Sequence, residues 1–178
     1  GQISWTAVHK DSKGAYGKRI QETSLTPVTL TLVQDSDALA RANGAKLRDI
    51  KKEAVARLCN EAYKQKGCMS LADISVLLKI APATASKYIL EYEQENSVIL
   101  PQRGTIHDMG PTITHKEMII EKLFIEQKTV QQVMRETNHS SKAIERYITA
   151  FKRVLLCVRK GMNRDQIAYS LSLHKKSN

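Results

Sequence analysis

Apolar residues recur at helical spacing through most of the chain after residue 43, and one arrangement of them appears three times. Each copy has an aliphatic residue, a small or flexible one, two variable positions, the end of a short helix, and a turn that leads into a second helix. The copies are Ile74–Ala85, Val133–Ile144 and Ile167–Asn178. Two helices joined in this way are typical of a helix-turn-helix, whose second helix enters the major groove of DNA. The pattern therefore predicts tandem helix-turn-helix units.

Residues 1–43 follow a different pattern. The segment Val28–Val33 alternates apolar and polar residues strictly and is rich in β-branched side chains, which predicts a strand. Ile3–Val8 alternates less regularly, and a Gly-containing turn region separates the two segments. Three arrangements fit these segments: they pair as a hairpin, they serve as an exchanged edge strand in a dimer, or they form a partly ordered arm that packs only against the rest of the protein or a partner.

Residues 44–111 are predicted to form the first helix-turn-helix. It begins with a long amphipathic helix that has a basic outer face and that we expect Gly67 to end. Ser70 is a suitable N-cap for a helix over residues 71–78, and Pro82 suits the first turn of the helix that follows.

The second helix of this first unit is the expected recognition helix. Ala85, Tyr88 and Ile89 are expected to face inward, which leaves three early positions exposed to contact bases or phosphates. These positions are Thr84, Ser86 and Lys87. After this helix, two short apolar segments flank Gln102–Gly104. In one alternative they form a small hairpin with Arg103 at its tip, which would make the unit winged-helix-like; in the other, the segment is a plain loop.

Residues 112–160 are predicted to form the second helix-turn-helix. Thr114 can cap a helix over residues 115–127, and Thr129 one over residues 130–137. Asn138 takes the turn position that glycine often holds, because asparagine tolerates left-handed geometry. Ser140 then caps the second recognition helix, whose expected contact residues are Ser141, Lys142, Arg146, Thr149, Lys152 and Arg153.

Residues 161–178 begin a third unit, with Asn163 as the expected N-cap of a helix over residues 164–171. The sequence stops about where the recognition helix of this unit should start. We therefore expect an incomplete third helix-turn-helix, which can support the second unit but cannot read DNA by itself.

The charge distribution supports a polyanionic partner. Lys and Arg number 28 against 18 Asp and Glu, which gives a formal net charge of +10. Phosphate contacts made by such an excess release counterions and favour nucleic-acid binding. The second recognition helix is strongly basic, whereas residues 71–96 are mildly acidic, so the two units need not share DNA contacts equally.

Other residue types narrow the class of protein. Three cysteines without a Cys-x-x-Cys pair predict reduced thiols in a cytoplasmic, nucleoid-associated protein, and no apolar run is long enough for a membrane span. Scattered histidines predict no metal site, and we expect no cofactor and no small-molecule substrate. The aspartates that could be imagined as catalytic carboxylates have structural explanations: Asp73 and Asp165 fit helix N-terminal positions, and Asp108 fits a turn. The chain is therefore expected not to be an enzyme.

Several segments resemble the domain-of-unknown-function family 1670 of archaea and bacteria, from about Val28 to the C-terminus. The matching segments are Arg57–Leu58, Glu61–Gln65, Leu71–Leu78, Leu100–Gly104, Ile106–Pro111, Thr114–Lys116, Asn138–Ser140, Ala143–Tyr147 and Phe151–Val154. The resemblance implies tandem helix-turn-helix units in a prokaryotic, often mobile-element-linked context, but it implies no established activity. The missing third recognition helix departs from the family pattern.

The expected fold is mainly α, with tandem helix-turn-helix or winged-helix-like units and a small N-terminal β element. The expected function is sequence-specific binding of double-stranded DNA, as a transcriptional regulator or as the DNA-recognition subunit of a mobile-element system. One alternative is an adaptor that docks on a polymerase or another protein partner, and a homodimer also fits. RNA binding is a further alternative, although two Phe and one Trp supply few stacking platforms.

Overall fold

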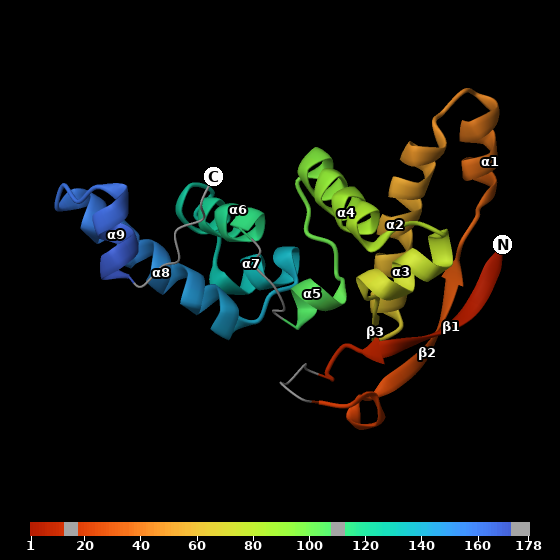
Figure 1. Ribbon diagram of the computed structural model, residues 1–178, viewed down its shortest axis with the longest axis horizontal. Coiled ribbons are helices and arrows are strands. Elements are labelled where there is room, and N and C mark those ends of the chain that lie inside the picture. Colours follow the sequence, from red (N-terminus) through yellow and green to blue (C-terminus); the bar gives the residue numbers. More distant parts are fainter. Residues whose placement is uncertain (13–17, 108–112, 172–178) are drawn as a thin grey trace. The chain divides into compact units, whose positions relative to one another are not determined.

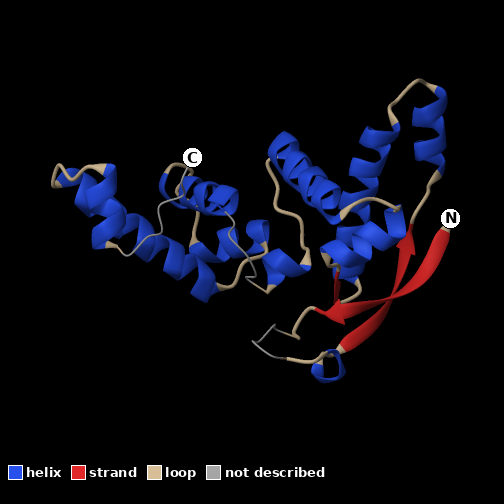
Figure 2. Ribbon diagram, viewed as in Figure 1, coloured by secondary structure: helices blue, strands red, loops and turns tan. Residues whose placement is uncertain are grey.

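The computed structural model describes residues 1–12, 18–107 and 113–171. It divides into two compact units, each with its own core (Figures 1 and 2). Unit 1 contains residues 1–111 with residues 136–138, and unit 2 contains residues 112–135 with residues 139–178. The predicted boundary at residues 108–111 and the last residues of the third pattern, 172–178, lie outside the described residues.

Unit 1 combines a small antiparallel sheet with helices. Its elements are β1 (Gln2–His9), β2 (Leu25–Thr31), α1 (Asp35–Ala42), α2 (Leu47–Lys64), β3 (Gly67–Cys68), α3 (Leu71–Leu78), α4 (Pro82–Asn96) and α5 (Arg103–Ile106), with a 3-10 turn at Ile20–Glu22. Unit 2 is built from α6 (Ile113–Phe124), α8 (Ser141–Arg159), α9 (Arg164–Ser170) and the part of α7 (Val130–Thr137) up to residue 135. The mainly α fold with a small N-terminal β element is confirmed.

The two N-terminal segments pair as a hairpin, which is one of the three predicted alternatives. β1 and β2 are antiparallel, with Trp5 opposite Val28, and β3 joins the free side of β1 to give the strand order β2-β1-β3. Val28 and Leu30 point into the core and Thr29 is exposed, as the strict alternation predicted. The strands share one apolar cluster with α2, α3 and α4, so the hairpin is part of the core of unit 1.

The helix starts in unit 1 follow local capping chemistry. The Ser70 hydroxyl accepts a hydrogen bond from the Asp73 backbone N–H at 3.2 Å, and the Asp73 carboxylate accepts one from the Ser70 backbone N–H at 2.8 Å. This reciprocal capping box begins α3 where the sequence predicted it. Pro82 is the first residue of α4, and the predicted inward residues Ala85, Tyr88 and Ile89 are buried.

Unit 1 departs from the sequence-based expectations at three places. Gly67 does not end α2: Lys66 adopts the left-handed backbone at φ 66°, and Gly67 is already part of β3. The helix α1 was not predicted, although its two acidic residues near the N-terminal end and its alanines favour a helix. Neither alternative for the segment around Gln102–Gly104, a winged hairpin or a plain loop, is present in the described residues, because Gln102 caps the short helix α5 and Arg103 is the first residue of that helix.

Unit 2 has a three-helix core in which Ile119, Val133 and Ile144 are fully buried. The predicted cap at Thr129 is confirmed, since its hydroxyl accepts a hydrogen bond from the Gln132 backbone N–H at 3.3 Å. α6 differs from its prediction at both ends: it begins at Ile113 and ends at Phe124. The side chain of Thr114, its predicted cap, lies outside the described residues.

Candidate nucleic-acid interface

The start of α8 is fixed by two residues of the turn before it. Asn138 adopts the left-handed conformation at φ 55°, as predicted from the tolerance of asparagine for this geometry. The Ser140 hydroxyl then accepts a hydrogen bond from the Ala143 backbone N–H at 3.2 Å, which satisfies one of the free donors of the first turn. The remaining N–H groups of this turn and the helix dipole give the start of α8 a positive partial charge.

α8 has one face toward the core and another toward solvent. Ala143 and Ile144 are buried, and Tyr147, Ile148 and Phe151 are half-buried. These positions recur at helical spacing, so the opposite side of the helix must carry the polar residues. The inward residues thereby determine which side chains of α8 can reach a ligand.

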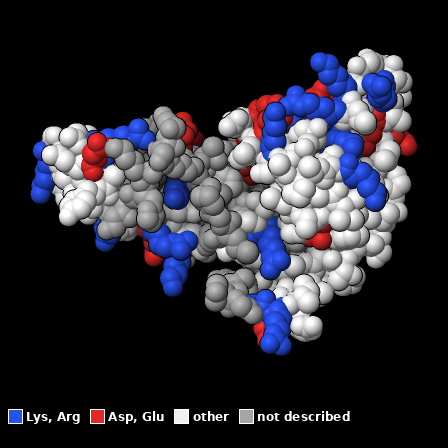
Figure 3. All heavy atoms as spheres, viewed as in Figure 1, with Lys and Arg blue, Asp and Glu red and all other residues white. Residues whose placement is uncertain are grey.

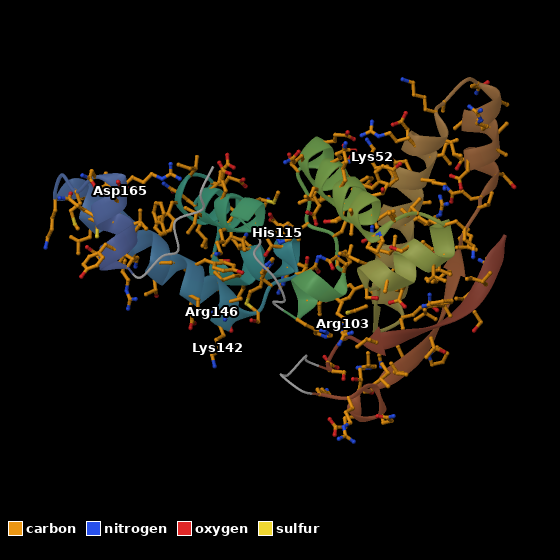
Figure 4. All side chains as sticks on the ribbon, viewed as in Figure 1. Lys52, Arg103, His115, Lys142, Arg146 and Asp165 are labelled. Atoms are coloured by element: carbon orange, nitrogen blue, oxygen red, sulfur yellow. The ribbon has the colours of Figure 1, made fainter. Side chains whose placement is uncertain are left out.

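The solvent face of α8 carries every contact residue predicted for the second unit. All of these residues are exposed: Ser141, Lys142, Arg146, Thr149, Lys152 and Arg153. Lys142, Arg146, Thr149 and Arg153 are separated by four, three and four residues, so they form one row, which we name the α8 stripe. At 1.5 Å of rise per residue the stripe is about 16 Å long. Figure 4 shows Lys142 and Arg146 projecting from the same side of α8.

The electrostatic field of this helix is strongly positive. Between residues 142 and 160 the sequence has six basic residues and one acidic residue, Glu145. The stripe residues, with Glu145 and Ala150, line a shallow depression along the helix, and basic side chains are visible over this part of unit 2 in Figure 3. Such a surface attracts phosphates, and its Lys and Arg donors match guanine or phosphate acceptors.

The predicted contact residues of α4 have a different environment. Lys87 is exposed and its ammonium lies 3.9 Å from the Glu91 carboxylate, while Thr84 and Ser86 are half-buried. Arg48 from α2 also pairs with Glu91, at 2.5 Å. Basic and acidic side chains intermix over α2 and α4 (Figure 3). The field at α4 is therefore weak compared with that at α8.

Arg103 does not occupy the predicted position at the tip of a wing. It is half-buried at the start of α5, and its backbone N–H donates to the Met69 carbonyl at 2.8 Å. Its Nε atom is buried and has no hydrogen-bond partner among the described residues. Arg103 therefore lies on α5 and not on α4, the candidate recognition helix of the same unit (Figure 4).

The sequence predicts a basic outer face for α2, but several of its basic residues instead make contacts within unit 1. Lys52 is buried and forms an ion pair with Glu95 of α4 (Figure 4). Its hydrogen bond with Glu95 raises the pKa of Lys52 above its ordinary value, against the opposing effect of burial. The Lys51 ammonium donates to the Leu78 carbonyl at 3.0 Å. Because these partners are distant in the sequence, only the folded chain reveals them.

The cysteines are free thiols. Cys59 and Cys68 are buried, and burial raises the pKa of Cys59 to about 12 and that of Cys68 to about 11. Cys157, on α8, is half-buried. Within the described ranges, His, Cys, Asp and Glu side chains form no group of three that could hold a metal ion. No helix among the residues that the structure describes is both long enough and apolar enough to cross a membrane.

The chain is therefore a mainly α protein in which two units each present a short helix, a turn and a longer helix. It belongs to the family described as Protein of unknown function (DUF1670), which it matches over residues 1–177. The match confirms the resemblance and extends it to the N-terminal strands. No curated protein and no solved structure matches the chain significantly.

Proposed function

We propose that the chain binds double-stranded DNA in a sequence-specific manner, with α8 as its main recognition helix. The observation that carries this proposal is the α8 stripe: three cationic side chains and a threonine in one row, all exposed, on the side of the helix opposite the core. A row of this kind on the second helix of a helix-turn-helix fits the major groove.

The predicted contact residues of α8 have three roles in this proposal. Lys142 and Arg146 lie near the start of α8 and would donate to guanine O6 and N7. Lys152 and Arg153, further along the helix, would contact phosphates and fix its register on the duplex. The hydroxyl of Ser141, at the positive end of the helix, and that of Thr149, more than two turns further along, would add hydrogen bonds to phosphates or bases.

α4 would make a smaller contribution through Thr84, Ser86 and Lys87. The Glu91 carboxylate near Lys87 offsets part of its charge, so this helix adds little to the salt-dependent part of affinity. Arg103 is not included, because the hairpin that would have presented it is replaced by α5. In a cell, duplex binding would place the protein on the nucleoid, as a regulator or as the recognition subunit of a mobile-element system.

A protein-docking role for unit 1 is a second candidate. It is favoured by the mixed charges of α4, where Lys87 and Arg48 both meet Glu91 and leave no strongly basic face. In this alternative, unit 2 grips DNA while unit 1 holds a polymerase or another protein. Reversing the charges of Lys142 and Arg146 would then abolish DNA binding and leave the protein partner bound.

The first test is selection of bound sequences from a random duplex library at two salt concentrations. We expect a recovered motif, and we expect the double variant Lys142→Glu and Arg146→Glu to lose at least about thirtyfold in affinity for it, because each specific contact contributes about 1–3 kcal/mol. The phosphate contacts are tested by replacing Lys152 and Arg153 with alanine, which should make the dependence of log affinity on log salt less steep by about 1.8.

The matched control is the double variant Lys64→Glu and Lys66→Glu, which makes the same charge change at two exposed residues of unit 1. The control should keep most of the affinity and the motif. Absence of duplex binding at low salt, or equal losses in the two double variants, would contradict recognition by α8.

A further inference from the structure

Unit 1 has an apolar cavity of about 380 Å³ between α1, α2 and α3. Leu32 and Val33, which follow β2, line it together with Leu47 and Ile50 of α2 and Leu77 of α3. Val33 is 56% exposed and Leu47 is 57% exposed, so these walls are open to solvent. A mostly apolar cavity near the lower end of the usual range of roughly 300–1,000 Å³ suits a small ligand.

The helix α1 forms one wall of this cavity but has little packing of its own. Ala38 and Arg41 line the cavity, yet α1 buries none of its residues. Figure 1 shows α1 beside the first turns of α2, to which a short loop joins it, and the ion pair between Asp37 and Arg57 attaches the two helices. Because a helix of about two turns is not stable without tertiary packing, a ligand between α1 and α2 would supply apolar contacts that α1 lacks.

Two cations in the cavity lining are held by backbone carbonyls. The Lys51 ammonium donates to the Leu78 carbonyl at 3.0 Å. The Arg41 guanidinium donates to the Ala45 carbonyl, also at 3.0 Å. Neither cation forms an ion pair with a carboxylate among the residues that the structure describes. The one carboxylate of the lining, that of Asp37, is already in its ion pair with α2, so the charge that the cavity offers a ligand is positive.

We propose that this cavity binds a small amphipathic anion, a free carboxylate with an apolar chain. The chain of the ligand lies against Leu32, Ile50 and Leu77, and burial of its apolar surface drives binding. The carboxylate accepts charge-assisted hydrogen bonds from the N–H groups of Lys51 that the Leu78 carbonyl leaves open, and Arg41 adds positive charge. The site is independent of the proposed duplex binding, because the cavity belongs to unit 1 and the α8 stripe to unit 2.

The test is isothermal titration calorimetry of the full chain with octanoate, in the absence of nucleic acid. We expect saturable binding of octanoate, and no binding of octylamine, which has the same chain with a cationic head, or of acetate, which lacks the chain. Lys51→Met should raise the dissociation constant for octanoate at least about tenfold, because it removes the cation and keeps an apolar stem. The matched control is Lys64→Met, the same change at an exposed residue of the same helix, and it should bind octanoate like the wild type.

Amide hydrogen exchange of residues 35–42 gives a second readout. We expect octanoate to slow the exchange of α1, because the bound chain packs against this helix. If Lys51→Met does not fold, Arg41→Met replaces it in the titration: Arg41 is exposed, so this variant should fold like the wild type and bind octanoate more weakly. Absence of octanoate binding, equal binding of octanoate and octylamine, equal affinities of the cavity variant and Lys64→Met, or unchanged exchange of α1 would overturn the proposal. Since no DNA is present, failure here is distinct from failure of duplex binding.

Discussion

At the scale of single residues, Gly67 shows that glycine can be required because a side chain would not fit, and not because the backbone needs conformational freedom. Lys66, just before it, adopts the left-handed conformation, and Gly67 continues into β3 against β1. A Cβ atom added at Gly67 would lie 2.9 Å from Val28 Cγ1 and 3.1 Å from the Ala7 Cβ. The absence of a side chain at residue 67 therefore allows the sheet and α2 to pack closely.

Gly67→Ala should lower the free energy of unfolding of unit 1 by about 1–3 kcal/mol, because the added methyl group overpacks a dense core. Urea denaturation followed by the fluorescence of Trp5, the single tryptophan, measures this change. In a Val28→Ala background the nearest atom is gone, so the cost of Gly67→Ala should fall. An equal cost in both backgrounds would show that the contact with Val28 is not its cause.

At the scale of elements, α2 organises unit 1 through polar side chains along one side. Glu61 accepts a hydrogen bond from the Thr31 N–H at 2.7 Å, and Gln65 accepts one from the Thr29 N–H at 2.9 Å. Arg57 donates to the carbonyls of Thr31 and Leu32. These bonds satisfy the outer edge of β2, which would otherwise be open to pairing with another strand. Arg57 also forms an ion pair at 2.7 Å with Asp37, which attaches α1 to α2.

The attachment of α1 should depend on acid pH. Burial acts to raise the pKa of Asp37, but hydrogen bonds from Arg57 and the Gln34 backbone N–H, with the charge of Arg57, outweigh it and lower that pKa below 3.8. A carboxylate whose pKa is lower in the folded than in the unfolded state stabilises the fold at any pH above its unfolded-state pKa. This stability is lost as the pH falls through the folded-state pKa. Asp37→Asn should cost about 2 kcal/mol at neutral pH.

Urea titrations of the wild type and Asp37→Asn at several pH values check this expectation. The free energies of unfolding of the two proteins should converge as the pH falls below 3.8. Asp35→Asn, at an exposed position in the same turn, should stay closer to the wild type at neutral pH. A difference between wild type and Asp37→Asn that stays constant at acid pH would contradict the role of the Asp37 charge.

At the scale of the whole molecule, two separate cores of unequal size stabilise the chain. The cluster of unit 1 joins residues of β1, β2, α2, α3 and α4, whereas that of unit 2 is centred on three buried side chains. Because buried apolar area largely determines stability, unit 2 should be the less stable of the two. The proposed DNA contacts would thus lie on the unit that has the smaller core.

Thermal unfolding should therefore show two transitions, with unit 2 unfolding first. Trp5 reports on unit 1 alone, while circular dichroism reports on the helices of both units. Ile144→Ala should lower the stability of unit 2 by about 2–5 kcal/mol and shift only the early part of the circular dichroism curve, whereas Leu58→Ala should shift the Trp5 fluorescence curve. Coincident curves from the two probes in all three proteins would show that the units unfold as one.

Features that depend on neighbours in the sequence were predictable. The caps at Ser70, Ser140 and Asn163 were identified correctly, because a cap needs only a side-chain oxygen two or three residues before a free N–H. The exposed row of α8 was also predicted, since the inward residues recur at 3.6-residue spacing and leave the opposite face to solvent.

Features that depend on residues distant in the sequence were not predictable. A wing was one of two alternatives for residues 98–107 because two short apolar segments there can form a hairpin, but Met69 pairs with Gln102 and favours the start of α5 at that point. The helical pattern places Lys52 among the basic residues outside the apolar face, and the pattern does not reveal its partner Glu95, which is 43 residues away. The helix α1 is short and buries no residue, so its apolar pattern gave no clear signal.

The sequence by itself determined where most helices begin, which sides of them face inward, and that α8 carries the concentrated positive charge. These properties are local, because hydrogen bonds within one turn and helical spacing define them. Only the tertiary structure decided that the N-terminal strands belong to the core, that Gly67 is required for close packing, and that Lys52 and Arg57 serve unit 1 internally. Each of these depends on contacts between segments far apart in the chain, which no local pattern specifies.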